Sequence, residues 1–482
     1  MVLLMLPSSF VREVERLELR DFVVVLPGIL GSTLIRNGQE IWAPSAGAVW
    51  KAIRSFGASI QCLTLPVDLG DVHPGDGVEA LALMPDLHVL PGIWSANIGY
   101  SRLLGSLTQR FKLVLADPKD FATPGNLLPF AYDWRLSCRY NARRLKRVVE
   151  PALERWRALD QANRDARLIF ICHSMGGLVA RWYVEQEGGA AHTRKLITIG
   201  TPHRGAVAAL QQLVNGVEKT VGPLRLELTR FARSLPSAHQ LLPQYACLET
   251  GAGLTPISAV ALPNLNPALV ADAVAFHTAL DAAPASAYAL HPIVGTRQPT
   301  PTTARLVGER IETSDAIEGA REGGDGTVPR LSAAPKALSP DDPRLRYAPD
   351  QHLGLHSHQA VLDELEGVLT ARPVIHRSLA GPEIGLRIQP LLLLGEPLLV
   401  WAEVAANQPL GLMAELLDES GRLVEQRKLR MEDSGQGQIC VFQPPRAGAW
   451  QVRVKAAGGS ASAVTTRPVS AISLVCPLEE GP

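Results

Sequence analysis

One short segment of this sequence could carry out nucleophilic chemistry. Residues 172–177 read CHSMGG, at the end of the apolar stretch RLIFIC, which predicts a buried strand, and just before a stretch with helical spacing. A serine on a sharp strand-to-helix turn projects its hydroxyl from the sheet, as in a nucleophile elbow. The residues two before and two after Ser174 must be small, and they are Cys172 and Gly176. Cysteine thus replaces the usual first glycine, and a strand–turn–helix with a merely buried serine is the alternative.

A serine nucleophile also needs a base and an orienting carboxylate, in the chain order serine, acid, histidine. The segment EGGDGTVPR places Asp325 among glycines in a loop, although Asp-Gly is also a common turn. Residues 350–358, DQHLGLHSH, then offer three histidines. His352 fits the base best because it lies in a loop several residues before a predicted helix, and we expect His356 and His358 at the surface. A three-histidine metal site is the alternative, but no carboxylate or motif supports it, so we expect no metal.

The oxygen that becomes negative during acyl transfer needs two backbone N–H donors. We expect one donor at Met175, the residue after the nucleophile. The other is expected in the loop PGILG at residues 27–31, where glycines let the backbone approach a substrate carbonyl. A simple turn at the end of a strand is the alternative for that loop.

Two further motifs are expected to be structural. In AYDWRLS, a tryptophan beside an Asp–Arg pair most often fixes a loop, so Asp133 and Trp134 are not assigned to substrate. His203, in GTPHRG, precedes the acid in the sequence and is expected to fix a loop rather than to act as the base.

The elements that must position these residues alternate between strands and helices, which predicts a parallel sheet covered on both faces. Strands are predicted at Phe22–Val25, Arg167–Cys172, Lys195–Ile199, Ala289–Val294 and Leu345–Tyr347. Helices are predicted at Gly99–Phe111, Asn141–Leu159, Leu178–Glu187 and Val361–Leu369. The long segment 205–287 is expected to be mostly helical.

The pattern changes near residue 372. From Ile384 onward, about seven short alternating segments separated by turn signals predict a small β-sandwich of immunoglobulin-like type. We expect this all-β domain to span residues 380–482, after a linker at Ala371–Leu379.

Composition narrows the function classes. Hydrophobic residues make up 46% of the 482, and Lys+Arg equals Asp+Glu at 47 each, which argues against a general nucleic-acid binder and against disorder. The six cysteines are scattered without zinc-site spacing and predict free thiols. No signal peptide or membrane-spanning stretch is visible, so we expect a cytoplasmic protein.

Taken together, these segments resemble the lecithin:cholesterol acyltransferase (LCAT) family of α/β-hydrolases, which includes phospholipid:diacylglycerol acyltransferases, phospholipases A and bacterial relatives. AYDWRLS and GDGTVP are fairly specific to that family, whereas HSMGG is not. The segments that carry the resemblance are VVVLPGILGSTL (23–34), IW (41–42), FAYDWRLS (130–137), HSMGGLVARWY (173–183), ITIGTPHRGA (197–206), GDGTVPR (324–330) and QHLGL (351–355).

The resemblance implies an α/β-hydrolase fold and a site. It implies Ser174 as the nucleophile, Asp325 as the triad acid and His352 as the base. It also implies that the backbone N–H of Leu30 is the early oxyanion donor, beside that of Met175.

The region around Trp42 resembles the lid over the acyl site in this family, so Trp42 is a candidate lid or substrate contact. Family members that act on lipoproteins close that region with a disulfide, but only Cys62 lies there in this chain, so this lid would not be cross-linked. We expect residues 1–372 to form the hydrolase domain, with cap or lid insertions at about 36–98 and 205–287.

The predicted function is serine-dependent acyl transfer on lipid esters through an acyl-enzyme, with no cofactor. The acceptor is water in a lipase or phospholipase and an alcohol in an O-acyltransferase. Trp50 and Phe56 could touch lipid, but aromatic residues of this kind are more often simply packed. A small-ester carboxylesterase is one alternative, and an inactive hydrolase-fold scaffold with a β-sandwich binding module is another. The expected partners are a lipid ester, an alcohol acceptor and a peripheral membrane contact, but no nucleic acid.

Overall fold

The computed structural model describes most of the chain in thirteen ranges. They are residues 16–43, 63–66, 68–86, 99–116, 124–221, 224–283, 288–370, 384–389, 391–404, 410–419, 421–432, 437–457 and 468–476. Only the backbone is described for residues 218–221 and 224–227. The predicted linker Ala371–Leu379, Cys62, Trp50 and Phe56 lie outside these ranges.

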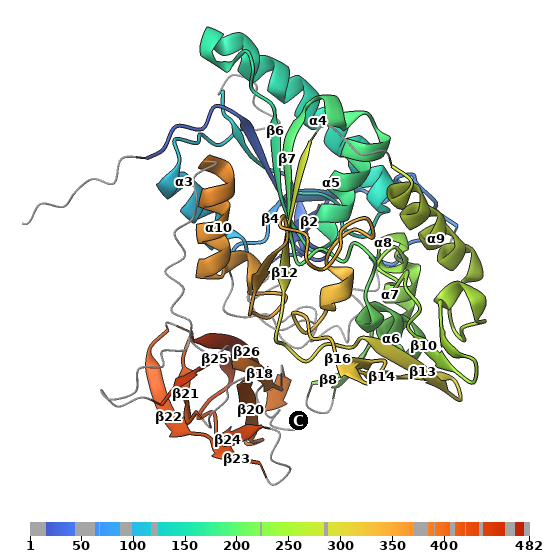
Figure 1. Cartoon of the computed structure of the whole chain (residues 1–482), viewed down its shortest axis with the longest axis vertical. Helices are drawn as coiled ribbons and strands as arrows, with labels where there is room; N and C mark the ends of the chain where they lie inside the picture. The colour runs from blue at the N-terminus through green and yellow to red at the C-terminus, as the bar shows by residue number, and fades with distance from the viewer. Residues whose placement is uncertain are drawn as a thin grey trace, which may run out of the picture.

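A parallel sheet of six strands stands at the centre of the first part of the chain (Figure 1). Its strand order is β17-β12-β7-β6-β1-β5, and every neighbouring pair is parallel. The strands are β1 (Phe22–Leu26), β5 (Leu127–Pro129), β6 (Leu168–His173), β7 (Thr193–Ile199), β12 (Ala289–Gly295) and β17 (Arg346–Ala348). Both faces of β1 and β6 are buried, as expected for continuous apolar runs such as FVVVL. The predicted α/β class is therefore confirmed.

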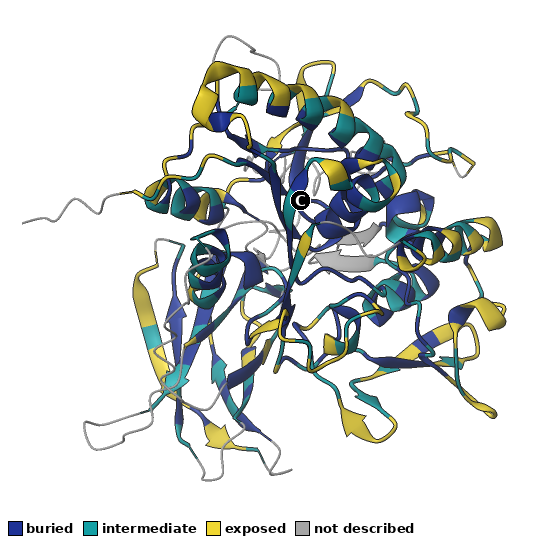
Figure 2. Ribbon diagram, turned by 45° about the horizontal axis from the view of Figure 1, so that its top comes forward, coloured by how far each residue is buried: buried dark blue, intermediate teal, exposed yellow. Residues whose placement is uncertain are grey.

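Helices cover the two faces of this sheet. Successive side chains of a strand point to opposite faces, so the apolar strands have side chains to bury on both. Val24 of β1 packs in the core that includes Leu145 of α4 (Cys138–Leu159) and Leu178 of α5 (Met175–Gln186). Val25 packs in the second core, with α3 (Ser101–Arg110) and α10 (Gln359–Thr370). Figure 2 shows the resulting layers, with buried central strands and exposed outer helix faces. No helix in the described ranges has the length and apolar character of a membrane span.

The segments inserted between these elements form smaller layers. Residues 32–83 contribute an antiparallel sheet of three strands, ordered β3-β2-β4. Its strands are β2 (Ser32–Arg36), β3 (Gln39–Trp42) and β4 (Val78–Leu83).

The segment 205–287 contains helices, as expected, but also short strands that were not expected. The segment contains α6 (Val207–Asn215), β8 (Glu218–Val221), β9 (Leu224–Glu227), α7 (Thr229–Ser234), α8 (Pro236–His239), β10 (Leu248–Thr250), β11 (Gly253–Thr255) and α9 (Pro267–Asp281). These strands are three or four residues long, too short to leave a period of two in the sequence. The strands β13 (Thr303–Val307), β14 (Arg310–Ser314), β15 (Ala316–Ile317) and β16 (Ala320–Arg321) follow β12.

The C-terminal part is the predicted β-sandwich, seen in orange and red in Figure 1. Its two sheets have the orders β18-β20-β24-β23 and β19-β26-β25-β21-β22, and their inner faces share one apolar core. The strands are β18 (Ile384–Ile388), β19 (Leu391–Leu393), β20 (Leu398–Val404), β21 (Leu412–Leu417), β22 (Leu423–Lys428), β23 (Arg430–Met431), β24 (Gln438–Phe442), β25 (Gly448–Ala456) and β26 (Val469–Cys476).

Candidate active site

Ser174 lies on a sharp turn between β6 and α5. Its backbone has φ 51° and ψ −128°, a sparsely populated conformation for a residue with a side chain. The Ser174 N–H donates to the carbonyl of Ile199 at 2.9 Å, which ties the turn to the neighbouring strand β7. A side chain at Gly176 would place its Cβ 2.4 Å from the carbonyl oxygen of Pro27, so only glycine fits there. The geometry is that of a nucleophile elbow, and Cys172 is accommodated in the buried end of β6.

A chain of hydrogen bonds joins Ser174, His352 and Asp325. The Ser174 Oγ lies 2.8 Å from His352 Nε2, and His352 Nδ1 lies 2.7 Å from Asp325 Oδ2. The other carboxylate oxygen of Asp325 accepts the N–H groups of Thr327 and Val328 at 3.0 and 2.7 Å. Since Nδ1–H donates to the carboxylate, Nε2 is left to accept the serine proton. Ser174, His352 and Asp325 can therefore act as a nucleophile, a base and an orienting acid, respectively.

The central sheet brings these three residues together at the carboxyl ends of its strands. Ser174 follows β6 directly, and His352 lies in the loop after β17. Asp325 comes some distance after β12 in the sequence, but Gly295 at the end of β12 packs against it: a Cβ on Gly295 would lie 2.4 Å from that of Asp325. The His352 N–H also donates to the Asp325 carbonyl at 2.7 Å, which fixes the two loops to each other.

The loop after β1 borders the serine. Leu30 has a positive φ of 65°, and the indole N–H of Trp42 donates to its carbonyl at 3.0 Å. The Gly28 N–H is already used, because it donates to the hydroxyl of Tyr100 at 2.8 Å. No intramolecular acceptor engages the N–H of Leu30 or Met175 among the described residues. In this part of the chain, neither N–H is thus committed to another partner.

A buried chain of rings that the motifs do not reveal lies beneath this loop. The Tyr100 hydroxyl lies 2.8 Å from His173 Nδ1, and His173 Nε2 lies 2.9 Å from the carbonyl of His352. A carbonyl only accepts, so Nε2 carries the proton and Nδ1 accepts from Tyr100. Burial, with the neighbouring His356 and His352, lowers the pKa of His173 well below its usual value, so His173 is neutral. Tyr100 and His173 therefore connect the Gly28 loop to the loop of His352.

The expectation that His356 lies at the surface is wrong. Its side chain is fully buried, its Nε2 lies 2.7 Å from the carbonyl of Gly99, and its ring stacks on Tyr100 at 4.6 Å. Burial lowers its pKa to about 4, so His356 is neutral as well. The sequence places His356 next to a helix but gives no sign that Tyr100 offers it a ring to stack on. His358 is only half-buried.

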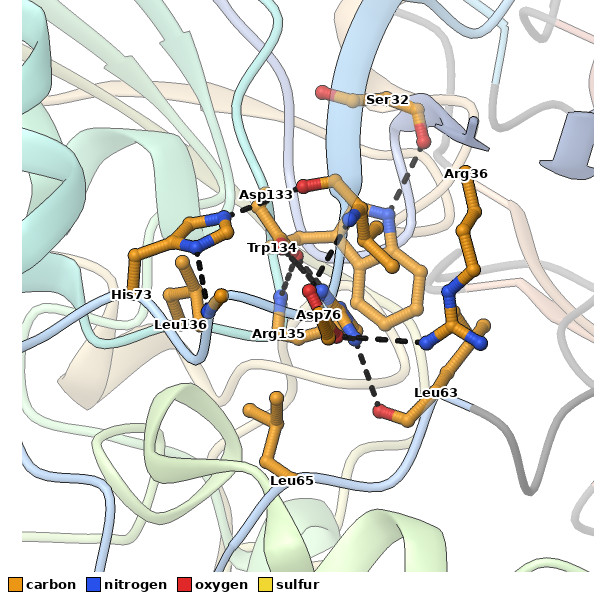
Figure 3. A network of polar contacts seen from close by, with 12 residues as sticks. Ser32, Arg36, Leu63, Leu65, His73, Asp76, Asp133, Trp134, Arg135 and Leu136 are labelled. Carbon is orange, nitrogen blue, oxygen red and sulfur yellow. Dashed lines mark hydrogen bonds and ion pairs between the residues drawn. The ribbon is translucent and has the colours of Figure 1, made fainter. Parts of the chain in front are cut away.

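The AYDWRLS motif forms a network of polar contacts that reaches Ser32 and Asp76 (Figure 3). The guanidinium of Arg135 makes a two-armed contact with the Asp133 carboxylate at 2.7 and 3.0 Å, and a further bond of 2.8 Å to Asp76. The Trp134 indole donates to the carbonyl of Ser32 at 3.1 Å, just after the Leu30 loop. These contacts agree with the structural role predicted for Asp133 and Trp134. His203 is likewise buried, its Nε2 lying 3.0 Å from the hydroxyl of Thr198.

A cavity of about 540 Å³ opens at Ser174 and His352. Apolar side chains dominate its lining: Leu213, Phe231 and Leu235 come from helices α6 and α7 and the start of α8. Trp42 lines the same cavity, and its ring meets that of Trp134 edge-on at 5.4 Å. Both predicted insertions therefore contribute to the walls.

Asp350, next to this site, gives a prediction for pH dependence. Burial raises the pKa of its carboxyl to about 7, although the Gln351 N–H bonds to it at 2.7 Å. Between about pH 4 and pH 7 the folded chain keeps a proton that the unfolded chain has lost, so stability falls as pH rises through this window. Asp350→Asn cannot ionise, and we expect it to be more stable than the parent at pH 8 but not at pH 4. The gain should be about 1.4 kcal/mol for each unit of pKa shift, measured by urea unfolding at both pH values.

The exposed Asp341 provides the control, since Asp341→Asn should change stability equally little at both pH values. An Asp350→Asn effect that is the same at pH 4 and pH 8 would show that this carboxyl does not carry the pH dependence.

Comparison with known proteins supports the resemblance seen in the sequence. The family model described as lecithin:cholesterol acyltransferase matches residues 120–259, which include Ser174 and the AYDWRLS motif but end before Asp325 and His352. The resemblance to this family is thus confirmed over that segment. It supports, in general terms, a hydrolase or acyltransferase acting on lipid esters. A search of curated proteins gave no significant match.

The solved structures similar to this chain include the following three. A Bacillus licheniformis lipase, BlEst2, in its mature form is 11% identical, with 74% of this chain and 95% of that chain covered and a TM-score of 0.32. Its propeptide form is 10% identical, with 95% and 94% covered and a TM-score of 0.34. The CARDB domain of a Pyrococcus furiosus protein is 10% identical, with 20% and 93% covered and a TM-score of 0.15.

Proposed function

We propose that this protein transfers acyl groups from lipid esters through an acyl-enzyme on Ser174. The observation that carries the proposal is the hydrogen-bonded chain from Ser174 through His352 to Asp325 at an apolar cavity. Residues 120–259, which match the LCAT family model, include the nucleophile.

The reaction would proceed in two halves. His352 Nε2 takes the proton of Ser174 Oγ as that oxygen attacks the ester carbonyl, and Asp325 stabilises the imidazolium that forms. The N–H groups of Leu30 and Met175 bind the negative oxygen of the tetrahedral intermediate. His352 then gives its proton to the departing alcohol. Water or an acceptor alcohol attacks the acyl-enzyme by the same steps in reverse.

The ring network around the site serves this chemistry by holding backbone in place. Trp42 holds the carbonyl of Leu30, in the peptide that follows the N–H donor, so Trp42 restrains the loop that carries this donor besides lining the cavity. His173 holds the carbonyl of His352 and, as a neutral ring, adds no positive charge that would oppose the imidazolium formed on His352. A donor held in advance needs no reorganisation when charge develops on the substrate.

Chain length of the acyl group provides the first test. We expect kcat/KM for p-nitrophenyl esters to rise from acetate to octanoate, because each buried methylene contributes about 0.8 kcal/mol, or roughly fourfold, while the chain still fits the cavity. The side chains of Leu213 and Phe231 would contact the acyl chain. A steady fall from acetate upward would contradict the proposal and favour a small-ester carboxylesterase. Product analysis with and without an added long-chain alcohol then separates hydrolysis from acyl transfer.

We also infer that the chain consists of a hydrolase domain, residues 1–372, and a β-sandwich domain, residues 380–482. The separate apolar core of the sandwich supports this division. We expect a chain ending near Leu379 to unfold in one cooperative transition in urea. Insoluble protein or a gradual transition would mean that the sandwich is part of the hydrolase fold.

A further inference from the structure

Strand β18 belongs to the β-sandwich but reaches the cavity at Ser174. Three consecutive residues of this strand, Leu386, Arg387 and Ile388, line that cavity. One edge of β18 pairs with β20 inside the sandwich, where Leu386 is opposite Ala402. The other edge faces the loops that carry Asp325 and His352. The sandwich therefore supplies part of the wall of the site.

Two glutamines hold this second edge. The Leu386 N–H donates to Gln298 Oε1 at 3.1 Å, and Gln351 Nε2 donates to the Leu386 carbonyl at 3.0 Å. Gln351 directly precedes His352 in the chain, and the Gln298 N–H donates to the carbonyl of Gly324, the residue before Asp325, at 2.9 Å. Each glutamine thus joins β18 to one of the two loops that complete the hydrogen-bonded chain.

The approach of the two backbones is close at the start of this strand. A Cβ at Gly385 would lie 2.7 Å from the carbonyl oxygen of Arg297, so a larger residue would push β18 away. Gln298 is 1% exposed, so its bond to Leu386 is made out of water. Breaking such a buried hydrogen bond leaves its donor and acceptor unpaired. The free-energy penalty of these unpaired groups exceeds the net contribution of the bond to stability. The close approach at Gly385 and the buried bond to Gln298 therefore fix the position of β18 beside the site.

Arg387 gives this wall a positive charge. It is the sole Lys or Arg among the described residues that line the cavity. Its guanidinium stacks over the ring of Trp401 at 5.2 Å, which limits its freedom.

Charged side chains of both signs lie near Arg387. Glu403 on β20 interacts with Arg387, Arg321 and Arg297, and Asp315 adds a second carboxylate. Glu432, whose carboxylate accepts from the indole N–H of Trp401 at 3.3 Å, is a third carboxylate nearby. Of these charged groups, Arg387 is the one that lines the cavity. A carboxylate or phosphate on a bound ester would find a favourable partner here, because guanidinium groups pair well with both.

We propose that strand β18 is a specificity-determining wall of the ester site, and that Arg387 makes the site prefer esters carrying an anionic group beside the acyl chain. This inference rests on the proposed function. It assigns to the sandwich a direct part in substrate selection.

A pair of chromogenic esters tests the proposal on the full chain. The octanoyl ester of 3-hydroxy-4-nitrobenzoate carries a carboxylate, and 2-nitrophenyl octanoate has the same acyl chain without it. We expect Arg387→Glu to lower kcat/KM for the anionic ester about tenfold, mainly through KM, and to change the neutral ester less than twofold. Arg427→Glu is the matched control: Arg427 is also an exposed arginine stacked on an aromatic ring of the sandwich, that of Phe442, but it does not line the cavity. It should change neither ester.

Equal loss for both esters, or no loss for either in Arg387→Glu, would overturn the proposal. A binding experiment separates this from failure of the proposed function. Ser174→Ala protein should bind decyl phosphate more tightly than decyl glucoside by calorimetry, and adding Arg387→Glu should remove that preference. If Ser174→Ala protein prefers decyl phosphate but the parent protein cleaves no ester, the proposed function alone is refuted. Equal binding of the two amphiphiles would refute the role of Arg387.

Discussion

Replacing Ser174 with alanine is expected to lower kcat/KM for octanoyl esters by a thousandfold or more while the fold stays intact. Without its hydroxyl no acyl-enzyme can form, and losses of this size are usual when a serine nucleophile is removed. Among the described residues, the Ser174 side chain bonds to His352 Nε2 alone, so alanine leaves the packing of the elbow unchanged. Steady-state kinetics and urea unfolding of the same preparation measure the two parts of the prediction.

The two buried histidines of the loop provide the matched comparison. His352→Ala should lose activity almost as severely as Ser174→Ala, because the base is gone. His356→Ala should lose little activity per folded molecule but should be less stable, since it removes the ring stacked on Tyr100. Turnover above a tenth of the parent in Ser174→Ala would contradict the nucleophile assignment, and the reverse ranking of the histidines would move the base to His356.

The parts of the fold that could be predicted from sequence are those with a continuous local pattern. Strand β6 and helix α5 leave an apolar run followed by helical spacing, so the turn between them and Ser174 on it could be predicted. Strand β5, by contrast, is three residues long, and its LLP sequence carries no period of its own. It is a strand because it pairs with β1, which is a tertiary interaction.

The same distinction separates the residues of the candidate site. Asp325 and His352 lie in short motifs, and their loops could be singled out by chain order alone. Tyr100 and Gln298 lie in no motif, and the QHLGL motif gives no sign of what Gln351 binds, since these roles come from contacts with distant residues, such as the bond between Gln298 and Leu386, 88 residues apart. The site wall formed by β18 could not be predicted for the same reason.

Removal of the Arg135 charge is expected to have the largest effect on stability. The side chain of Arg135 is 0% exposed, and it neutralises the carboxylates of Asp133 and Asp76 at 2.7 and 2.8 Å. Arg135→Met has a similar length but leaves the buried Asp133 without its cation. Breaking a buried ion pair by removing one partner costs about 3–5 kcal/mol, because the remaining charge is uncompensated in a medium of low polarity. Urea unfolding at pH 7 measures the loss.

An exposed ion pair on the same chain shows how much of that loss is due to burial. Arg305 lies 3.0 Å from Glu312, but their side chains are 61% and 58% exposed, so Arg305→Met should cost less than about 1 kcal/mol. Equal losses for the two variants would mean that burial does not set the strength of the Arg135 network.

The network also holds Trp134, which donates to the carbonyl of Ser32 just after the Leu30 loop. The fraction of Arg135→Met protein that remains folded should therefore show reduced kcat with little change in KM. A larger KM with unchanged kcat would instead indicate that the network shapes the substrate cavity rather than the oxyanion donors.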